Sequence, residues 1–173
     1  MMRALLVLLG IVAGAGCVRV PSGVATVDRL DLNRYQGTWY EIARLDHPFE
    51  RGLTNVSATY TLRADGRIEV LNRGYDPTTE KWKEIGGWAI PLSPPATGRL
   101  KVSFFRPFYG AYNVIALDQE QYRYAMVCGP SRSYLWILAR DKRLELTVLE
   151  QLVRRAAELG FRTTDLIDVA HDR

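Results

Sequence analysis

Between Trp39 and Arg140 the chain repeats one unit, in which a short run rich in Val, Ile, Tyr, Phe, Trp and Thr is followed by turn residues. This spacing is typical of an all-β protein with short antiparallel strands. Proline cannot donate a hydrogen bond within a sheet, and it interrupts none of the runs. Eight strands are therefore predicted, over residues 39–45, 56–62, 67–74, 81–90, 99–105, 111–118, 122–128 and 134–140.

Alternation within the runs predicts which side chains face the core. In residues 100–104 the apolar Leu100, Val102 and Phe104 alternate with Lys101 and Ser103, so one face of that strand is apolar. The run 134–138 is apolar on both faces, so another element must cover its outer side.

That element is a helix predicted over residues 145–159, where apolar side chains recur at helical spacing and Gly160 provides a C-cap. A short strand is expected at 164–169. The predicted fold class is all-β, an eight-stranded antiparallel up-and-down β-barrel with one C-terminal α-helix packed outside. Such a barrel is just wide enough to be filled by side chains or to hold one small ligand. Small residues at predicted inward positions favour a cavity: Ala43, Ala58, Gly74, Ala116 and Ala125.

The N-terminus has the pattern of an export signal. Arg3 precedes an uncharged apolar run, residues 4–16, which is shorter than the ~20 residues that a membrane-spanning helix needs. Gly14-Ala15-Gly16-Cys17 resembles the bacterial lipobox, whose cysteine is acylated and becomes the first residue of the mature chain. The alternative is an ordinary secretory signal that contains a cysteine. The expected divisions are a lipoprotein signal peptide at 1–16, a tether from the lipidated Cys17 at 17–30, and the folded domain at 31–173.

Composition and residue spacing disfavour several function classes. The net charge is +4, but the basic residues are scattered, which disfavours a nucleic-acid-binding surface. An acylated Cys17 leaves Cys128 without a disulfide partner, and Cys128 is interpreted as a small buried hydrophobe. His47 and His171 have no partners at metal-ligand spacing. No triad, phosphate loop or carboxylate pair stands out, so we predict no enzyme activity, metal or cofactor.

Three short motifs carry a family resemblance. Gly37-Thr38-Trp39-Tyr40 resembles the Gly-x-Trp motif of lipocalins, Asp118 with Tyr122 and Tyr124 loosely resembles their second motif, and Arg140 resembles their third. In that family the arginine stacks over the tryptophan and closes the barrel floor. The resemblance therefore implies a structural floor made by Gly37, Trp39 and Arg140.

Longer segments, including residues 37–52, 100–105, 112–118 and 134–138, resemble the bacterial outer-membrane lipocalins, lipoproteins of the apolipoprotein D branch. The resemblance implies a lipid-anchored protein that faces the periplasm from the outer membrane. It also implies binding and carriage of fatty acids or lysophospholipids for envelope maintenance, as a homodimer. Val18, which follows Cys17, resembles the sorting signal for the outer membrane.

The candidate ligand-binding residues have rings or branched chains, some with polar tips, which suit a ligand with a long apolar tail and one polar end. Five of them are predicted inward and match pocket positions of the family: Tyr60, Asn72, Tyr112, Tyr134 and Trp136. Val70, Phe104, Val114 and Val127 complete the set.

Charged residues decide where a ligand's head is expected. Glu41 is two residues after Trp39 and is predicted inward, where a carboxylate is costly unless paired. No Lys or Arg falls on an inward position of the second to seventh strands, so a charged head is expected at the open mouth, near Arg51, Arg73 or Arg106.

Three alternatives remain open from the sequence. The barrel could hold haem or another porphyrin, with His47 involved. It could house an enzyme that acts on a bound lipid through Cys128 or Glu41. It could also be filled by side chains, in a purely structural envelope protein.

Overall fold

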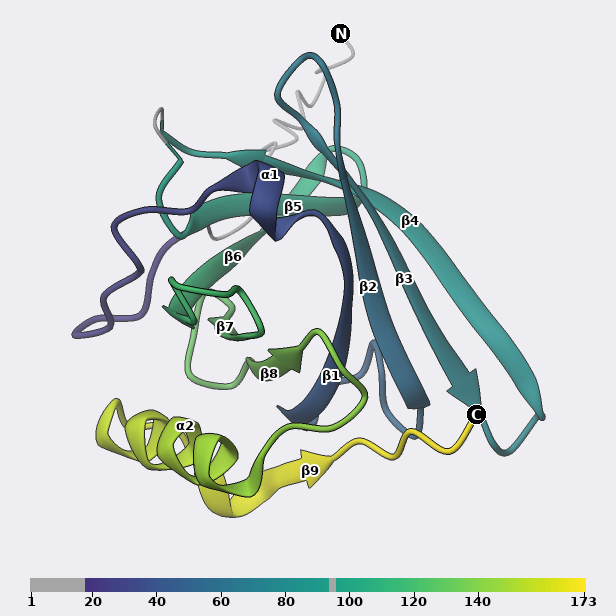
Figure 1. Cartoon of the computed structure of the whole chain (residues 1–173). Coiled ribbons are helices and arrows are strands. Elements are labelled where there is room, and N and C mark those ends of the chain that lie inside the picture. The colour runs from purple at the N-terminus through teal and green to yellow at the C-terminus, as the bar shows by residue number, and fades with distance from the viewer. Residues whose placement is uncertain (1–17, 94–95) are drawn as a thin grey trace, which may run out of the picture.

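The computed structural model describes residues 18–93 and 96–173. They form a closed antiparallel barrel with a helix on its outside, which confirms the predicted fold class (Figure 1). The eight barrel strands lie within a few residues of the predicted positions. They are β1 (Gly37–Leu45), β2 (Thr54–Leu62), β3 (Ile68–Asp76), β4 (Lys81–Pro91), β5 (Arg99–Phe105), β6 (Phe108–Leu117), β7 (Tyr124–Cys128) and β8 (Leu135–Ala139).

Consecutive strands pair around the barrel, and β1 closes it by pairing with both β8 and β2. The β1–β2 ladder is short, from Gly37 opposite Tyr60 to Tyr40 opposite Ser57. Connections therefore alternate between two ends of the barrel. The end with the β2–β3 and β6–β7 connections is called the closed end, and the end with the β1–β2, β5–β6 and β7–β8 connections is called the mouth.

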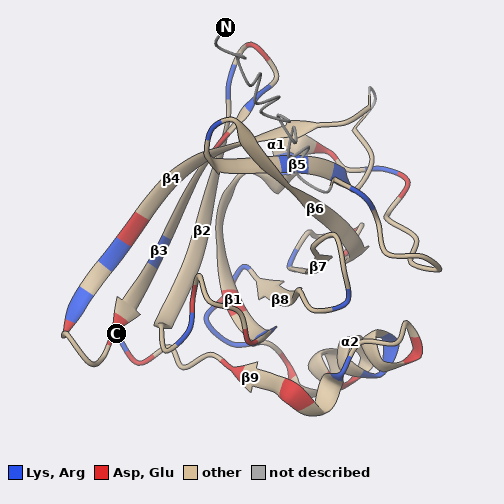
Figure 2. Ribbon diagram, turned by 180° about the vertical axis from the view of Figure 1, so that it is seen from behind, with Lys and Arg blue, Asp and Glu red and all other residues tan. Residues whose placement is uncertain are grey.

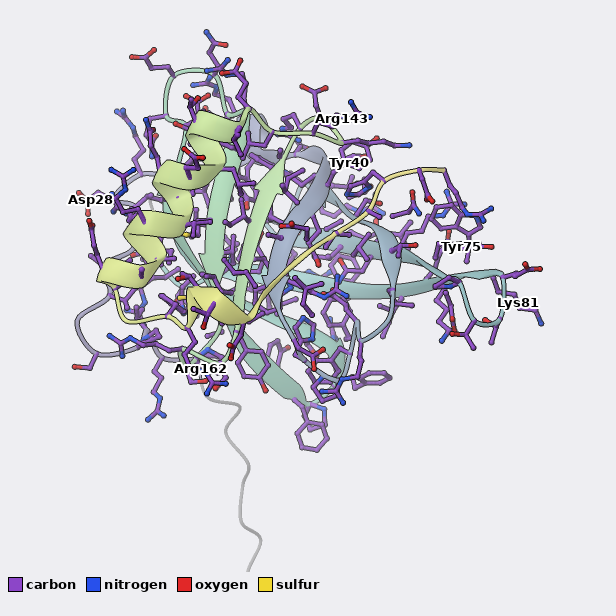
Figure 3. All side chains as sticks on the ribbon, turned by 90° about the horizontal axis from the view of Figure 1, so that it is seen from below. Asp28, Tyr40, Tyr75, Lys81, Arg143 and Arg162 are labelled. Atoms are coloured by element: carbon purple, nitrogen blue, oxygen red, sulfur yellow. The ribbon has the colours of Figure 1, made fainter. Side chains whose placement is uncertain are left out.

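The predicted helix is confirmed as α2 (Leu146–Glu158), which lies across the outside of the barrel (Figure 3). Its buried residues Leu152 and Ala156 pack on outward side chains of β1, β6, β7 and β8, including Ile115 and Ile137. This outer core covers the second apolar face of β8. A 3₁₀ turn, η1 (Thr163–Asp165), leads to a short strand β9 (Leu166–Asp168) that pairs with β1.

A short helix that the sequence analysis did not predict, α1 (Leu32–Tyr35), precedes β1. Asp31 caps it, because its carboxylate accepts hydrogen bonds from the amides of Asn33 and Arg34. The helix brings the ring of Tyr35, which is 2% exposed, into the barrel core.

Two β-bulges change which side chains face inward. The β1–β8 register shifts between Glu41 and Ala43, and the β6–β7 register shifts between Val114 and Ala116. A bulge adds one residue and reverses the alternation after it. The prediction that Ala43 and Ala116 point inward was therefore wrong, since both pack in the outer core.

Residues 18–30, expected as a tether, pack along the barrel. The amide of Val27 donates to the carbonyl of Val114 at 2.9 Å, and Val24 is buried in the outer core. The apolar residues Val20, Val24, Val27 and Leu30 explain this packing. The predicted signal peptide and Cys17 lie outside the described residues. No helix in the described part of the chain is long and apolar enough to span a membrane.

Candidate ligand-binding site

The barrel interior contains its own apolar core, separate from the outer core beneath α2. Four of the candidate ligand-binding residues are buried there, namely Tyr60, Val70, Val114 and Val127. Phe104, Tyr112 and Trp136 pack against the same cluster but are only partly buried. Tyr134 precedes β8 and stacks on Trp136, with ring centroids 6.2 Å apart.

Solvent reaches part of this interior. Asn72 and Ile85 are paired across β3 and β4 on the inward face, yet Ile85 is 37% exposed. The Asn72 Oδ1 atom is buried without a hydrogen-bond partner. Ile85 lies in the part of β4 that precedes its pairing with β5, so solvent reaches the inward face where the β3–β4 hairpin extends beyond β5. A buried carbonyl without a partner, such as that of Asn72, favours a polar occupant.

The closed end is sealed by Trp39 and Arg140. Trp39 is fully buried, its Nε1 donates to the carbonyl of Tyr35 at 2.8 Å, and the Arg140 guanidinium lies 4.0 Å above the indole ring. Arg140 also donates to the carbonyls of Thr38, Arg34 and Tyr122. These contacts tie together β1, α1 and the β6–β7 connection.

Gly37 makes room for this arrangement. Its φ is +90°, a region that residues with a side chain rarely adopt, and a Cβ atom there would lie 3.3 Å from Arg140 Nη1. Glycine at this position therefore allows the guanidinium to reach the indole.

Three phenols form a hydrogen-bonded group above the floor. The Tyr112 hydroxyl lies 2.7 Å from that of Tyr35 and 2.9 Å from that of Tyr60. Burial raises the pKa of all three phenols. They therefore stay neutral, and they add polarity but no charge to the interior.

The bulge in β1 points the Arg44 side chain into the barrel, where Arg44 pairs with Trp136 on β8. Arg44 is 2% exposed, and its Nη1 donates to Glu41 Oε1 at 2.7 Å. Burial raises the Glu41 pKa well above its usual value, the nearby Glu50 carboxylate raises it further, and Arg44 acts in the opposite direction. The expectation that an inward Glu41 needs a partner is therefore met by Arg44.

The β1–β2 connection folds over this pair. Arg44 Nη2 donates to the carbonyls of Glu50 and Leu53, which holds the connection against the barrel. Glu50 Oε2 accepts from Trp136 Nε1 at 3.1 Å and lies 3.0 Å from His47 Nε2. Burial alone would raise the Glu50 pKa, but His47 and the indole N–H lower it.

Sequence reasoning missed Arg44, Glu50 and Tyr35 as parts of this site. On a regular strand, alternation from Trp39 and Glu41 would point the Arg44 side chain outward, so only the bulge brings it inside. A signal was available, because Arg44 is a lone cation in the run Ile42-Ala43-Arg44-Leu45. We name Glu41, Arg44, His47 and Glu50 the polar cluster.

Cys128, weighed as a reactive group in the interior, lies in the outer core and is fully buried. Burial raises the pKa of its thiol to about 12, so little thiolate forms near neutral pH.

A separate hollow of about 410 Å³ lies outside the barrel, between β6 and α2. Its walls include Ile115, Val148 and Arg155.

The closed barrel, outer helix and arginine-capped floor are those of a lipocalin. A family model described as a lipocalin-like domain matches residues 30–171, and the chain belongs to the lipocalin family. Among solved structures, insecticyanin from the tobacco hornworm Manduca sexta is similar in fold, with a TM-score of 0.70 at 20% identity, over 90% of this chain and 88% of that one.

More specific similarity comes from bacterial relatives. The chain is 54% identical over 147 residues to outer membrane lipoprotein Blc of Citrobacter freundii, covering 85% of this chain and 82% of the relative. It is 48% identical over 168 residues to outer membrane lipoprotein Blc of Vibrio cholerae, covering 97% and 98%. Apolipoprotein D of Macaca fascicularis is more distant, at 35% identity over 68% of this chain and 64% of the relative.

Proposed function

We propose that the chain is a lipid-anchored protein of the outer membrane, facing the periplasm, that stores or carries a fatty acid or lysophospholipid for envelope maintenance. The relatives named as outer membrane lipoproteins support the location, and Gly14-Ala15-Gly16-Cys17 supports the anchor. The observation that supports the ligand class is the composition of the barrel interior, in which an apolar cluster lies beside neutral phenols, the polar cluster and the buried, unpartnered carbonyl of Asn72.

A single acyl chain suits such an interior energetically. Burying ~15 methylene groups at ~0.8 kcal/mol each gives ~12 kcal/mol of gross stabilisation. Association costs ~4–15 kcal/mol, so the net complex is reversible. Reversible binding is what a carrier needs, and we propose that the lipid is released unchanged.

The head group is proposed to stay at the mouth. Arg44 is a buried cation that sequence alternation did not place inside, but Glu41 already holds it in an ion pair. A fully enclosed fatty carboxylate would therefore find no unpaired cation, and its loss of hydration would be costly. A head in water at the mouth avoids this cost and can be large. Of the basic residues expected there, Arg51 pairs with Asp46 and Arg73 with Glu84, whereas Arg106 is exposed.

We also propose a homodimer, as the family resemblance implies. Sedimentation of the purified protein at several concentrations tests it. A single species of monomer mass at every concentration would contradict it.

Mass spectrometry of lipids extracted from the purified native protein tests the ligand class. Single-chain lipids in about one-to-one ratio with protein support the proposal. A Soret absorbance that His47→Ala abolishes would instead indicate a porphyrin carrier. Conversion of the lipid to a new product by the purified protein would indicate an enzyme.

A further inference from the structure

The described chain begins at the mouth of the barrel. Asn113 Nδ2 donates to the carbonyl of Arg19 at 3.1 Å, and Arg19 Nε lies 3.4 Å from the carbonyl oxygen of Pro130. Pro130 belongs to the β7–β8 connection, which is one of the mouth connections. Arg19 is thus held beside the rim of the β7–β8 wall.

This position limits where an anchor at Cys17 can reach. Two residues of extended chain span at most ~7 Å, which is the longest tether available between Arg19 and an anchor at position 17. The five residues of β7, Tyr124–Cys128, separate the rim from the closed end by roughly 16 Å. The chain that leads to the predicted anchor therefore leaves the described barrel at the mouth and not at the closed end.

The mouth also carries the exposed aromatic side chains that a membrane interface favours. Phe49 is 79% exposed on the β1–β2 connection, and Phe105 and Phe108 are 69% and 63% exposed at the tip of the β5–β6 hairpin. The hairpin projects, because β6 pairs with β7 only from Asn113 onward. The two connections stand on either side of the β7–β8 rim, since strand order runs from β5 through β8 to β1.

Three acidic side chains near the mouth are paired with basic ones. Asp46 pairs with Arg51, and along β3 and β4 Asp76 pairs with Lys83 and Glu84 with Arg73. Figure 2 shows basic segments followed by an acidic one at the start of β4. Arg106, between the two phenylalanines of the hairpin, adds an exposed positive charge that suits anionic phospholipid heads.

We propose that Phe49, Phe105 and Phe108 form the surface that rests on the bilayer holding the Cys17 anchor, so that the mouth opens onto the membrane. This inference rests on the anchor of the proposed function. Lipid would then exchange between bilayer and barrel over a short, aromatic-lined path, with its head group at the interface throughout.

Depth measurements with nitroxide labels test the orientation. The acylated full-length protein is reconstituted into phosphatidylethanolamine and phosphatidylglycerol vesicles, with labels on Phe105→Cys, Phe108→Cys or, as the control, Leu146→Cys. Leu146 is 67% exposed at the start of α2, which follows the closed-end terminus of β8. Native Cys128 is buried with a raised pKa and stays unlabelled.

The expected result is that labels at 105 and 108 become accessible to oxygen and lose accessibility to a water-soluble nickel complex, whereas the label at 146 does not change. Labels at 105 and 108 that stay as water-exposed as 146, on protein that co-sediments with vesicles, would overturn the proposal. Burial of the label at 146 would overturn it too. Acylated protein that does not sediment with vesicles would instead contradict the anchor, and with it the orientation that depends on it.

Exchange kinetics give a second readout. Changing Phe49, Phe105 and Phe108 together to Ser is expected to slow uptake of a fluorescent lysophospholipid from vesicles several-fold, with unchanged affinity for the same lipid in solution. Uptake from vesicles at the original rate would contradict the proposal.

Discussion

Glu41 and Arg44 form an ion pair 2.7 Å long inside the barrel, with both side chains almost completely buried. The pair exists because the β-bulge in β1 turns Arg44 toward the interior. Either charge alone would be costly to bury, because a buried carboxylate or guanidinium needs its partner. The net charge of the Glu41–Arg44 pair therefore sets the free-energy cost of placing a ligand's anionic group inside the barrel.

Glu41→Gln tests this control of ligand choice. Glutamine keeps the shape and can still accept a hydrogen bond from Arg44, but it removes the compensating charge. We expect affinity for a fatty acid to rise about tenfold relative to a lysophospholipid of equal length, a difference of ~1.4 kcal/mol. Competition titrations measure the ratio, with the exposed Glu69→Gln as control. An unchanged ratio would show that the ligand head does not sense Arg44.

The pH dependence of stability tests the electrostatics of the same residue. The pKa of Glu41 is raised in the folded protein, chiefly by burial and then by Glu50, whereas Arg44 lowers it, so ionising Glu41 costs more in the folded protein than in the unfolded chain. This contribution is complete below the unfolded pKa, near 4.5, and is lost as pH rises through the folded value. The free energy of unfolding of wild type is therefore expected to fall more steeply above about pH 5 than that of Glu41→Gln. Urea denaturation across pH measures this, and parallel curves would refute it.

Arg140 is expected to support stability more than binding. Arg140→Ala removes the contact with Trp39 and three hydrogen bonds to carbonyls, which should cost about 2–3 kcal/mol. Denaturant unfolding measures the loss. The exposed Arg143→Ala, a control outside the barrel (Figure 3), should change stability little. An Arg140 variant with full stability and no ligand binding would assign this residue to the pocket instead.

Cys17→Ala tests the anchor directly. The variant should lose acyl labelling and leave the membrane fraction, while the barrel still folds, because the strands that close the barrel begin only at Gly37. Thermal melting of the released protein serves as the folding control. Membrane attachment equal to that of wild type would contradict anchorage through Cys17.

The strand pattern predicted the barrel because each strand has a run of β-forming residues between turn residues. The strands of the structure lie within a few residues of these runs. The side-chain directions were less predictable. A bulge depends on pairing with a neighbouring strand, so within the sequence only the lone cation Arg44 in an apolar run indicated that alternation breaks there. Helix α1 is four residues long, too short for a periodic signal. Residues 18–30 have the composition of a loop and were expected as a tether, because the apolar residues that pack on the barrel are scattered and give no periodic pattern.

We propose that one acyl chain occupies the barrel interior beside Trp136, which packs with the interior cluster and donates to Glu50. Titration with a lysophospholipid brominated along its acyl chain measures this contact through tryptophan fluorescence. Wild type should lose emission at one equivalent of ligand, and Trp136→Phe should lose most of that quenching while still binding in calorimetry. Saturable binding that leaves Trp136 emission unchanged would place the lipid elsewhere, such as in the hollow beneath α2, and would contradict binding of the acyl chain inside the barrel.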